Sequence, residues 1–339
     1  MGAAGLVLFL LLALPDPGTV QGKVVENFDE CSWFFQNKIP PQGFDTQNRV
    51  KICQRYKNHY HFVTLYRPDL RIPVYSAYRY PCTIGVEKKF RSNPWFYEPQ
   101  IDDRKASAEM TSSKDRSSDN QAVDADYKDS GYDRGHLYPF SFNENDSATA
   151  TCTLTNAVPQ KHEANVNWNK QVESIVLKLA LICHKSGRSM YVVTGSANST
   201  GSKLKNKVTV PEVAWTALCC TSPPGRINDP CLNNNVWSEE QSATTYDKDF
   251  SCAFKKKMEP EEDAVILTVR ALQRNLSMIK IFDSCRGTNQ DDEAENFEEV
   301  KTLIATVTSA ENGGGSIRGW SWGFAVLCCL LSKTWSMCV

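Results

Sequence analysis

The feature that most limits how this chain can fold is an amphipathic helix pattern followed by two apolar runs. Apolar residues recur at three- and four-residue spacing and predict a helix that begins near Asn165 and stops at Gly187. The runs MYVVTGS at 190–196 and VTVPEVAWTALCC at 208–220 have the composition of strands in a buried sheet. A fold built on this chain therefore has to pack a long helix against a sheet.

Further sheet and helix patterns lie on both sides of this unit. FVTLY at 62–66 and IPVYSAYRY at 72–80 predict a hairpin, whereas 102–130 is polar and predicts an exposed loop. AVILTVRAL at 264–272 fits a strand or a helix equally. Apolar spacing from Phe297 to Val307 predicts a last helix.

The acidic run Asp291–Glu299 in front of that last helix is interpreted as its solvated start. The sequence contains no internal repeat, and strands and helices follow one another along its length. The chain is therefore predicted to form one α+β domain over 23–310, with a mixed or antiparallel central sheet and flanking helices.

Both ends of the sequence carry apolar segments. The apolar run within 1–22 is too short to span a bilayer comfortably and precedes small and turn-forming residues, which predicts a secretory signal cleaved near Gly22. The tail at 311–339 joins small residues to an apolar stretch and resembles a lipid-anchor signal with a short spacer. A frayed C-terminus explains the tail equally well, so membrane attachment through it stays open.

Cysteine usage agrees with secretion. The chain has 13 cysteines, and ten of them lie between Cys31 and Cys285, an even number that predicts disulfides without revealing their pairing. A zinc site would need closely spaced ligand pairs, and the adjacent Cys219 and Cys220 have no second pair at that spacing. The glycosylation sequons compatible with secretion begin at Asn145, Asn198 and Asn275.

The charge balance limits how a polyanion could be bound. The formal net charge is −1, which excludes a strongly basic protein that coats nucleic acid through bulk electrostatics. A polyanionic substrate would therefore have to be bound locally. The candidate for such a site is SGYDRGHLYPFSFN at 130–143, which places Asp133, Arg134 and His136 within four positions. Taken alone, this short stretch also fits a solvated turn.

The predicted helix provides a second set of polar side chains. Asn165 and Glu173 are eight residues apart, which in an ideal α-helix places them about 80° apart around the axis and roughly 12 Å apart along it. They can border one cleft without touching each other. If the strand or turn that carries His136 packs against the start of the helix, an imidazole, a guanidinium, an amide oxygen and a carboxylate converge.

These groups suit phosphodiester hydrolysis, which needs an activated water and neutralisation of charge on phosphorus and on the leaving oxygen. His136 can take a proton from water, because the ordinary pKa of histidine is near about 6.5. Arg134 offers a permanent planar cation for phosphate oxygens. Asn165 offers a neutral oxygen ligand to a magnesium ion that keeps most of its waters, and Glu173 can orient one of those waters.

The order of these motifs is similar to that of a known family. SGYDRGHLYPF followed by TNAVPQKHEANVNWNKQVE resembles the DNA/RNA non-specific endonuclease family of the ββα-metal superfamily. The family signature is Asp-Arg-Gly-His, then Asn-x-x-Pro-Gln, then a helix with a metal-binding Asn and a Glu eight residues later. The matching positions are 133–136, Asn156, Asn165 and Glu173.

The resemblance covers roughly residues 60 to 285 and includes flanking stretches. RIPVYSAY and ADYKDSGYDRGH upstream, YVVTG downstream, and the paired cysteines after VPEVAWTAL are similar to the secreted endonuclease domain-containing 1 group within the family. The resemblance implies a ββα-metal active-site motif on the α+β domain.

The resemblance also implies a role for each motif residue. His136 would be the general base, and Arg134 would stabilise the phosphorane. Asn165 would be the direct ligand of a hydrated Mg²⁺, or of another hard cation such as Mn²⁺. Glu173 would hold a metal-bound water, and Asn156 would brace the site.

One motif residue is expected to have a structural role, and one position departs from the family pattern. Asp133 is expected to be structural and to tie the hairpin. The family usually places a Trp four residues after the metal-binding Asn, whereas Trp168 follows Asn165 by three. Asn167 and Asn169 therefore remain alternative ligands.

The sequence thus predicts a secreted, metal-dependent endonuclease that cleaves DNA and RNA with little sequence preference, because phosphates carry no sequence information. No organic cofactor is expected. Arg91 in FRSNPWFYEPQ is the candidate for a further substrate-binding cation beside Arg134. The alternative is a catalytically inactive secreted protein that keeps the fold and acts as a binding or innate-defence factor.

Two further sets of residues are predicted to be structural. Four histidines lack partners at matching positions, and one of them, His184, is interpreted as a cation in the last helical turn. The other three are His59, His61 and His162. The aromatic residues predicted to be core or packing residues, rather than base-stacking platforms, are Trp33, Phe34, Phe35 and Trp215.

Overall fold

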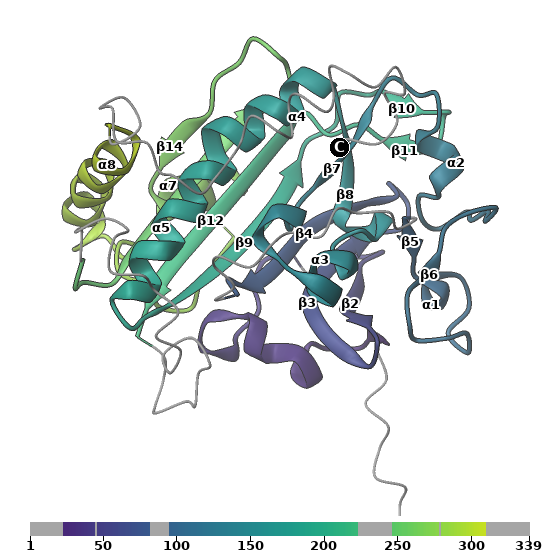
Figure 1. The fold of residues 1–339 in the computed structure, drawn as a ribbon, viewed down its shortest axis with the longest axis horizontal. Helices are drawn as coiled ribbons and strands as arrows, with labels where there is room; N and C mark the ends of the chain where they lie inside the picture. The colour runs from purple at the N-terminus through teal and green to yellow at the C-terminus, as the bar shows by residue number, and fades with distance from the viewer. Residues whose placement is uncertain (1–22, 45, 82–94, 223–245, 278, 310–339) are drawn as a thin grey trace, which may run out of the picture.

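An eight-stranded sheet forms the centre of the molecule (Figure 1). The computed structural model describes residues 23–44, 46–81, 95–222, 246–277 and 279–309. The strand order is β1-β2-β3-β4-β9-β12-β13-β14, and every neighbouring pair is antiparallel. The strands are β1 Lys23–Val25, β2 Val50–Tyr56, β3 His59–Arg67, β4 Ile72–Arg79, β9 Ser189–Ala197, β12 Val213–Thr221, β13 Phe250–Lys257 and β14 Val265–Leu267.

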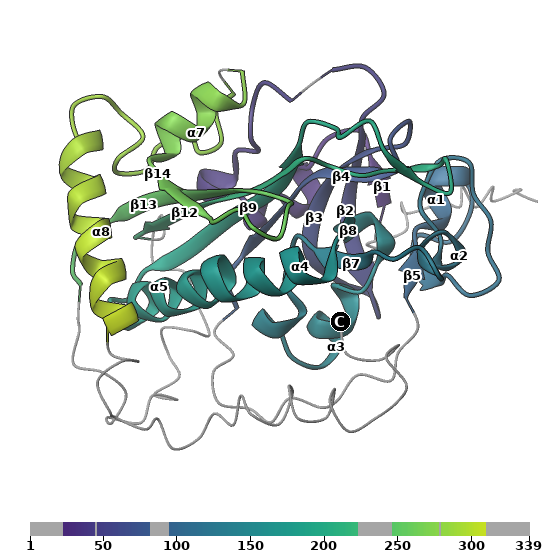
Figure 2. The same ribbon diagram turned by 90° about the horizontal axis from the view of Figure 1, so that it is seen from above.

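Helices cover both faces of this sheet (Figure 2). One face carries α4, which runs through a π-helical turn into α5, and α8 packs against α5 and β13. The opposite face carries α7 and the N-terminal 3-10 turns. The α+β class is therefore confirmed, with an antiparallel sheet. The helices are α1 Pro99–Asp102, α2 Asp124–Tyr127, α3 Asn145–Ala150, α4 His162–Trp168, the π turn Asn169–Glu173, α5 Ser174–Lys185, α7 Val269–Asn275 and α8 Glu293–Ser309.

A hydrophobic core lies on each face of the sheet. Strand β12 contributes side chains to both cores, because alternate side chains of a strand point to opposite faces. Trp215 is fully buried in the core beneath α7, and Leu218 is buried in the core beneath α5. The adjacent Cys219 and Cys220 therefore bond in opposite directions, one to each layer. Cross-links of this kind typically stabilise a fold by about 2–4 kcal/mol each, largely by restricting the unfolded chain. The disulfides within the described ranges are Cys31–Cys53, Cys183–Cys220 and Cys219–Cys285.

The long helix begins earlier than its apolar spacing predicts. Its first turn starts at His162 rather than near Asn165, and its last residue is Lys185. This first turn is polar because its His162 and Asn165 side chains bond to Asp133. Apolar periodicity therefore does not mark it. Gly187, with a φ of +69°, follows the end of the helix in a conformation that favours glycine.

The polar segment at 102–130 was wrongly predicted to be wholly exposed. It contains the short strand β6 (Thr111–Ser112), which pairs with β5 (Phe96–Tyr97), and it ends in helix α2. Gln121 is fully buried and donates hydrogen bonds to the Glu98 carbonyl at 2.7 Å and to Asp102 at 3.0 Å. Its polar side chains therefore bond to the protein, which composition alone could not show.

Three other element predictions are settled by the structure. The predicted hairpin is confirmed, because β3 and β4 pair antiparallel. The run at 208–220 is two strands rather than one, since β11 (Val208–Thr209), which pairs with β10 (Lys203–Leu204), ends before Pro211 and β12 begins after it. The ambiguous run at 264–272 is both a strand and a helix, joined at Thr268, whose hydroxyl accepts a hydrogen bond from the Ala271 amide at 2.9 Å.

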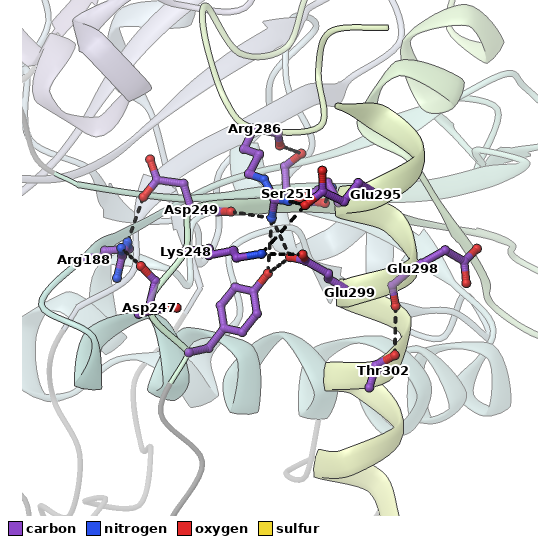
Figure 3. Close-up of polar contacts among 12 residues, drawn as sticks. Arg188, Asp247, Lys248, Asp249, Ser251, Arg286, Glu295, Glu298, Glu299 and Thr302 are labelled. Atoms are coloured by element: carbon purple, nitrogen blue, oxygen red, sulfur yellow. Dashed lines mark hydrogen bonds and ion pairs between the residues drawn. The ribbon is translucent and has the colours of Figure 1, made fainter. Parts of the chain in front are cut away.

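One charge prediction is wrong, and a second one is incomplete. His184 is 6% exposed, and burial lowers its pKa to about 4, so its ring is neutral at pH 7 rather than a helix-capping cation. The acidic run overlaps the start of α8 and is largely exposed, as predicted, but two of its carboxylates are also paired: Arg286 donates to Glu295 at 2.8 Å and to Glu299 at 2.6 Å (Figure 3). We call the ion-paired cluster around these residues the α8 clamp. It consists of Arg188, Lys248, Asp249, Arg286, Glu295 and Glu299.

Both terminal segments with apolar runs, 1–22 and 311–339, lie outside the described residues. Among the helices that the structure describes, none has the length and apolar character required to cross a bilayer. The predicted domain boundaries at 23 and 310 stay predictions.

Candidate active site

The Asp-Arg-Gly-His motif at 133–136 forms one strand of a short two-stranded ribbon. Strand β7 (Asp133–His136) pairs antiparallel with β8 (Ala157–Gln160), and α4 follows directly, which gives the predicted ββα arrangement (Figure 1). Gly135 is required here because a Cβ atom at this position would lie 2.3 Å from the Gln160 side chain. The motif glycine therefore leaves room for the Gln160 side chain on the face of the ribbon opposite to Arg134 and His136.

Arg134 is held by one carboxylate and two aromatic rings. Its Nη2 donates a 2.6 Å hydrogen bond to Asp124 Oδ1. Its guanidinium carbon lies 5.4 Å from the centroid of the Trp95 ring and 5.2 Å from that of Tyr127. Both distances suit cation–π attraction, which stabilises a partly buried cation. Among the described residues, the buried Nε of Arg134 has no hydrogen-bond partner, and the Arg134 side chain as a whole is 23% exposed.

His136 shares one of those aromatic partners. The His136 imidazole is partly buried, and its centroid lies 4.9 Å from that of the Trp95 indole, at an interplanar angle of 44°. The strand alternates, so Arg134 and His136 project to the same side of the ribbon. One indole therefore contacts both side chains that the sequence predicts to perform chemistry.

Asp133 joins the ribbon to the first turn of α4. Its Oδ2 accepts a 2.9 Å hydrogen bond from His162 Nδ1 and a 3.3 Å hydrogen bond from Asn165 Nδ2. An ionised carboxylate can only accept hydrogen bonds, so the amide nitrogen of Asn165 faces Asp133 and the amide oxygen is turned away from it. His162, which was expected to lack a partner, contacts this network.

The neighbouring asparagines are engaged elsewhere. Asn167 Nδ2 donates to the carbonyl of Pro260 at 3.0 Å, and Asn169 Nδ2 donates to Glu173 Oε2 at 2.8 Å. Asn165 is the asparagine of the three that bonds to the motif strand. The geometry therefore favours Asn165 over the two alternatives as the side chain that presents an oxygen to this site.

Glu173 lies at the end of the π turn. A π turn takes up one extra residue, so the eight steps from Asn165 to Glu173 rotate like roughly seven α-helical steps, about 700° in all. The two side chains are thus nearly on one side of the helix, in place of the 80° separation expected for an ideal α-helix. Burial raises the pKa of Glu173 to about 7, partly offset by hydrogen bonds from Asn169 and Trp168.

A small cavity adjoins Glu173. Its volume is about 10 Å³, room for about one water, and its lining includes Leu137, Thr194 and Thr216. Leu137 directly follows the motif strand and the two threonines lie on β9 and β12, so Glu173 faces the central sheet beside the end of the motif strand. The carboxyl group is therefore on the motif side of the helix in a partly desolvated position.

Asn156 is buried and uses all of its amide hydrogen-bonding capacity. Its Oδ1 accepts from the Tyr138 amide at 2.9 Å and from Ser76 Oγ at 2.8 Å. Its Nδ2 donates to the carbonyls of Tyr138 at 3.0 Å and Thr151 at 2.9 Å. These bonds fix the chain just after His136 onto the sheet, which is the bracing arrangement expected for this residue.

A buried chain of hydroxyl and amide side chains continues from Asn156 across the sheet. It ends at Glu98, which is 4% exposed and whose pKa is raised to about 8 by burial. Each contact in the chain is 2.8–3.2 Å long. The chain consists of Asn156, Ser76, Thr64, Gln54, Thr155, Thr153 and Glu98.

The donor set fits a hard divalent cation that keeps most of its waters. Asn165 offers one neutral oxygen, and Glu173 places a carboxyl group on the same side of the helix. Within the described ranges, no group of three or more His, Cys, Asp or Glu side chains could hold a metal ion. An ion bound here would therefore have few protein ligands.

The structure unites most of the predicted site residues and adds others. Arg134, His136, Asn156 and Asn165 converge on the ribbon and its connection to α4, and Glu173 lies beside the end of the motif strand. Arg91 lies outside the described residues.

The side chains that the sequence analysis missed are Trp95, Asp124, Tyr127 and His162. Asp124 and Tyr127 fall within ADYKDSGYDRGH, the stretch that carries the resemblance, so this signal was present but unused. Trp95 lies in FRSNPWFYEPQ, the stretch in which Arg91 was the predicted site residue.

Comparison with known proteins agrees with this geometry. The chain is 38% identical over 227 residues to the Homo sapiens endonuclease domain-containing 1 protein, covering 64% of this chain and 44% of that protein. The Mus musculus protein of the same name is 39% identical over 238 residues, covering 66% and 46%. A nuclease of Nostoc sp. is 33% identical over 146 residues, covering 36% and 52%.

The chain spans about half the length of these curated relatives. The sequence profile described as DNA/RNA non-specific endonuclease matches residues 39–251, which is more than half of the 339-residue chain. The matched range includes the ribbon and α4. The protein therefore belongs to the DNA/RNA non-specific endonuclease family.

Proposed function

We propose that this protein is a secreted, metal-dependent endonuclease that hydrolyses phosphodiester bonds in DNA and RNA. The observation that carries the proposal is the double hydrogen bond to Asp133, which joins Asn165 on α4 to the strand that holds Arg134 and His136. That junction brings an imidazole, a guanidinium and an amide oxygen to one place. Family membership agrees with the same chemistry.

His136 acts as the general base in this proposal. Its imidazole nitrogen takes a proton from a water while the water oxygen bonds to phosphorus and the bond from phosphorus to the leaving oxygen breaks. Arg134 donates hydrogen bonds to the non-bridging oxygens, where charge builds up on the phosphorane. The Trp95 and Tyr127 rings and Asp124 hold this guanidinium in place before substrate binds.

Asn165 and Glu173 serve the metal in this proposal. A bound Mg²⁺ or Mn²⁺ supplies positive charge that stabilises the leaving oxygen. Asn165, oriented by Asp133, would hold the ion through its amide oxygen, and Glu173 would orient one of the waters of the ion. Asn156 holds the backbone after His136 and so fixes the base relative to the helix.

Low sequence preference follows from the same residues, because each of them addresses phosphate, water or metal rather than a base edge. The formal net charge of −1 means that substrate attraction has to be local to the site.

Secretion is supported by two observations. The three disulfides within the described ranges are typical of an oxidising compartment. Each sequon asparagine is exposed, as glycan attachment requires: Asn145, Asn198 and Asn275.

The test is incubation of purified protein with supercoiled plasmid and, separately, with RNA, in Mg²⁺, in Mn²⁺ and in chelator. We expect cleavage of both substrates that depends on the metal. The matched control is His136→Ala from the same expression host, which excludes a contaminating nuclease. Absence of metal-dependent cleavage across a broad pH range would contradict the proposal and leave a secreted protein that binds without cleaving.

A further inference from the structure

We propose that Trp95 is a positioning residue that sets the His136 imidazole and the Arg134 guanidinium relative to each other. This inference rests on the proposed function, because it concerns the two side chains assigned to its chemistry. The indole lies 4.9 Å from the His136 ring and 5.4 Å from the Arg134 guanidinium carbon. A single rigid side chain thus contacts both groups.

Trp95 is not a platform for stacking nucleic-acid bases. It is 8% exposed, and its ring already contacts His136 and Arg134. Stacking platforms present an open aromatic face to the nucleic acid. The indole therefore acts through the groups it touches rather than on substrate directly.

The backbone at Trp95 is anchored by two hydrogen bonds. Its carbonyl accepts a 2.7 Å hydrogen bond from the Ser113 amide, and the next amide, of Phe96, donates to the Cys152 carbonyl at 2.9 Å. Phe96 also forms an isolated bridge with Thr153. The indole thus belongs to a segment anchored to the protein at two places.

Ser113 connects the same segment to the carboxylate that holds Arg134. The Ser113 hydroxyl accepts a 2.8 Å hydrogen bond from the Asp124 amide, and Asp124 in turn accepts from Arg134 at 2.6 Å. The contacts close a ring from Trp95 through Ser113, Asp124 and Arg134 back to the indole. A closed ring of contacts restricts each member more than an open chain does, so Arg134 is preorganised by Trp95 and Asp124 together.

Loss of the indole would free both side chains. Alanine at position 95 leaves an empty space beside His136 and Arg134 and removes the ring attraction for the cation. Displacement of reacting groups by about 1 Å lowers rates by about 10²-fold. We therefore expect the turnover number of Trp95→Ala to fall about 10²-fold, while the concentration of Mg²⁺ needed for half activity is unchanged.

Three variants test the proposal against a matched control. Trp95→Phe keeps an aromatic face and should retain most activity, whereas Trp95→Leu keeps apolar volume without that face and should lose activity like Trp95→Ala. Trp33→Ala is the control, because Trp33 is 47% exposed and packs on Phe34 and Tyr60 instead. Equal activity of Trp95→Leu and Trp95→Phe would overturn the proposal. Circular dichroism and thermal melting verify folding, and Trp95→Leu serves if Trp95→Ala fails to fold.

A second readout does not need catalysis. The His136 imidazole protons lie in the ring current of Trp95, so their NMR resonances, identified with His136→Asn, should move in Trp95→Leu and stay in Trp33→Ala. Unmoved resonances would overturn the positioning role even in an active enzyme. If the wild type cleaves nothing, the proposed function fails, and the NMR measurement still tests whether the Trp95 indole lies against the His136 ring.

Discussion

The α8 clamp and the candidate active site are both clusters of charged side chains, yet they use charge in opposite ways. In the clamp, Arg286 donates to two carboxylates, and Glu299 also accepts from Lys248 at 2.8 Å (Figure 3). In the site, Arg134 has a single carboxylate partner and is otherwise enclosed by rings. The clamp cation is therefore shared between two carboxylates, whereas the site cation is paired with one.

The pKa values of the carboxyl groups in the two regions are shifted in opposite directions. The cationic and hydroxyl donors Arg286, Lys248 and Tyr246 hold the pKa of Glu299 well below its usual range. Burial raises the pKa of Glu98 to about 8 at the end of the polar chain behind the site. Paired charge thus stabilises the clamp, whereas the region behind the site contains a carboxyl group that is destabilised when ionised. A tightly paired cluster therefore indicates a structural role, and a partly unpaired one indicates chemistry.

The largest effect should come from the base. His136→Ala should lower the cleavage rate about 10³-fold, because the proposed proton acceptor is lost, and leave the melting temperature unchanged. Plasmid relaxation rates and a thermal melt measure both quantities. His59→Ala, at an exposed strand end, is the control and should behave like the wild type. A wild-type rate in His136→Ala would remove this residue from the mechanism.

The next largest effect should be on how the free energy of unfolding depends on pH, which should differ between the two regions. Glu98 keeps its proton in the folded protein up to about pH 8, whereas the unfolded chain loses it near the ordinary value of 4.5. The free energy of unfolding should therefore fall as pH rises between these values, by about 2–4 kcal/mol, and Glu98→Gln should remove this loss.

Glu299 should show the opposite dependence. Because its pKa is lowered in the folded protein, its contribution is present above the ordinary value of 4.5 and is lost as pH falls below it. Glu299→Gln should remove this acid-side loss. Urea unfolding of both variants across the pH range checks the pair of predictions, and parallel pH profiles of wild type and both variants would contradict them.

A smaller effect should identify the metal ligand. Asn165→Ala should raise the Mg²⁺ concentration needed for half activity about 10–100-fold, because the oriented amide oxygen is lost. Asn167→Ala is the matched control, since that amide donates to the Pro260 carbonyl. A Mg²⁺ titration of initial rates measures both variants. The reverse order would mean that the helix presents a different asparagine to the site.

The smallest effect should come from the clamp. Arg286→Ala should reduce the free energy of unfolding by about 1–2 kcal/mol, because Glu295 and Glu299 lose a shared partner that is only 18% exposed. The activity of the folded protein should not change. Urea unfolding and cleavage rates test this together, and a large loss of activity with intact folding would end the distinction between the two regions.

Local sequence signals together with the family resemblance indicated the ribbon and most of the helix. The residues of the ββα motif lie within about 40 positions of one another, and their order and spacing matched the family signature at Arg134, His136 and Asn165. Trp95 and Asp124 were missed because neither belongs to that signature, and their contacts with Arg134 are made only by the folded chain. The pairing of Arg286 with the acidic run was missed because composition shows that charges are present but not which charges meet.

The sequence by itself determined which chemical groups are available and which elements carry them. Apolar periodicity and strand composition specify the long helix and the buried strands, because burial requires these patterns. Only the tertiary structure decided which asparagine faces Asp133, that the π turn brings Glu173 toward the side of Asn165, and that one indole contacts both Arg134 and His136. Such contacts depend on how the layers pack, and packing is set by the whole core rather than by any local stretch.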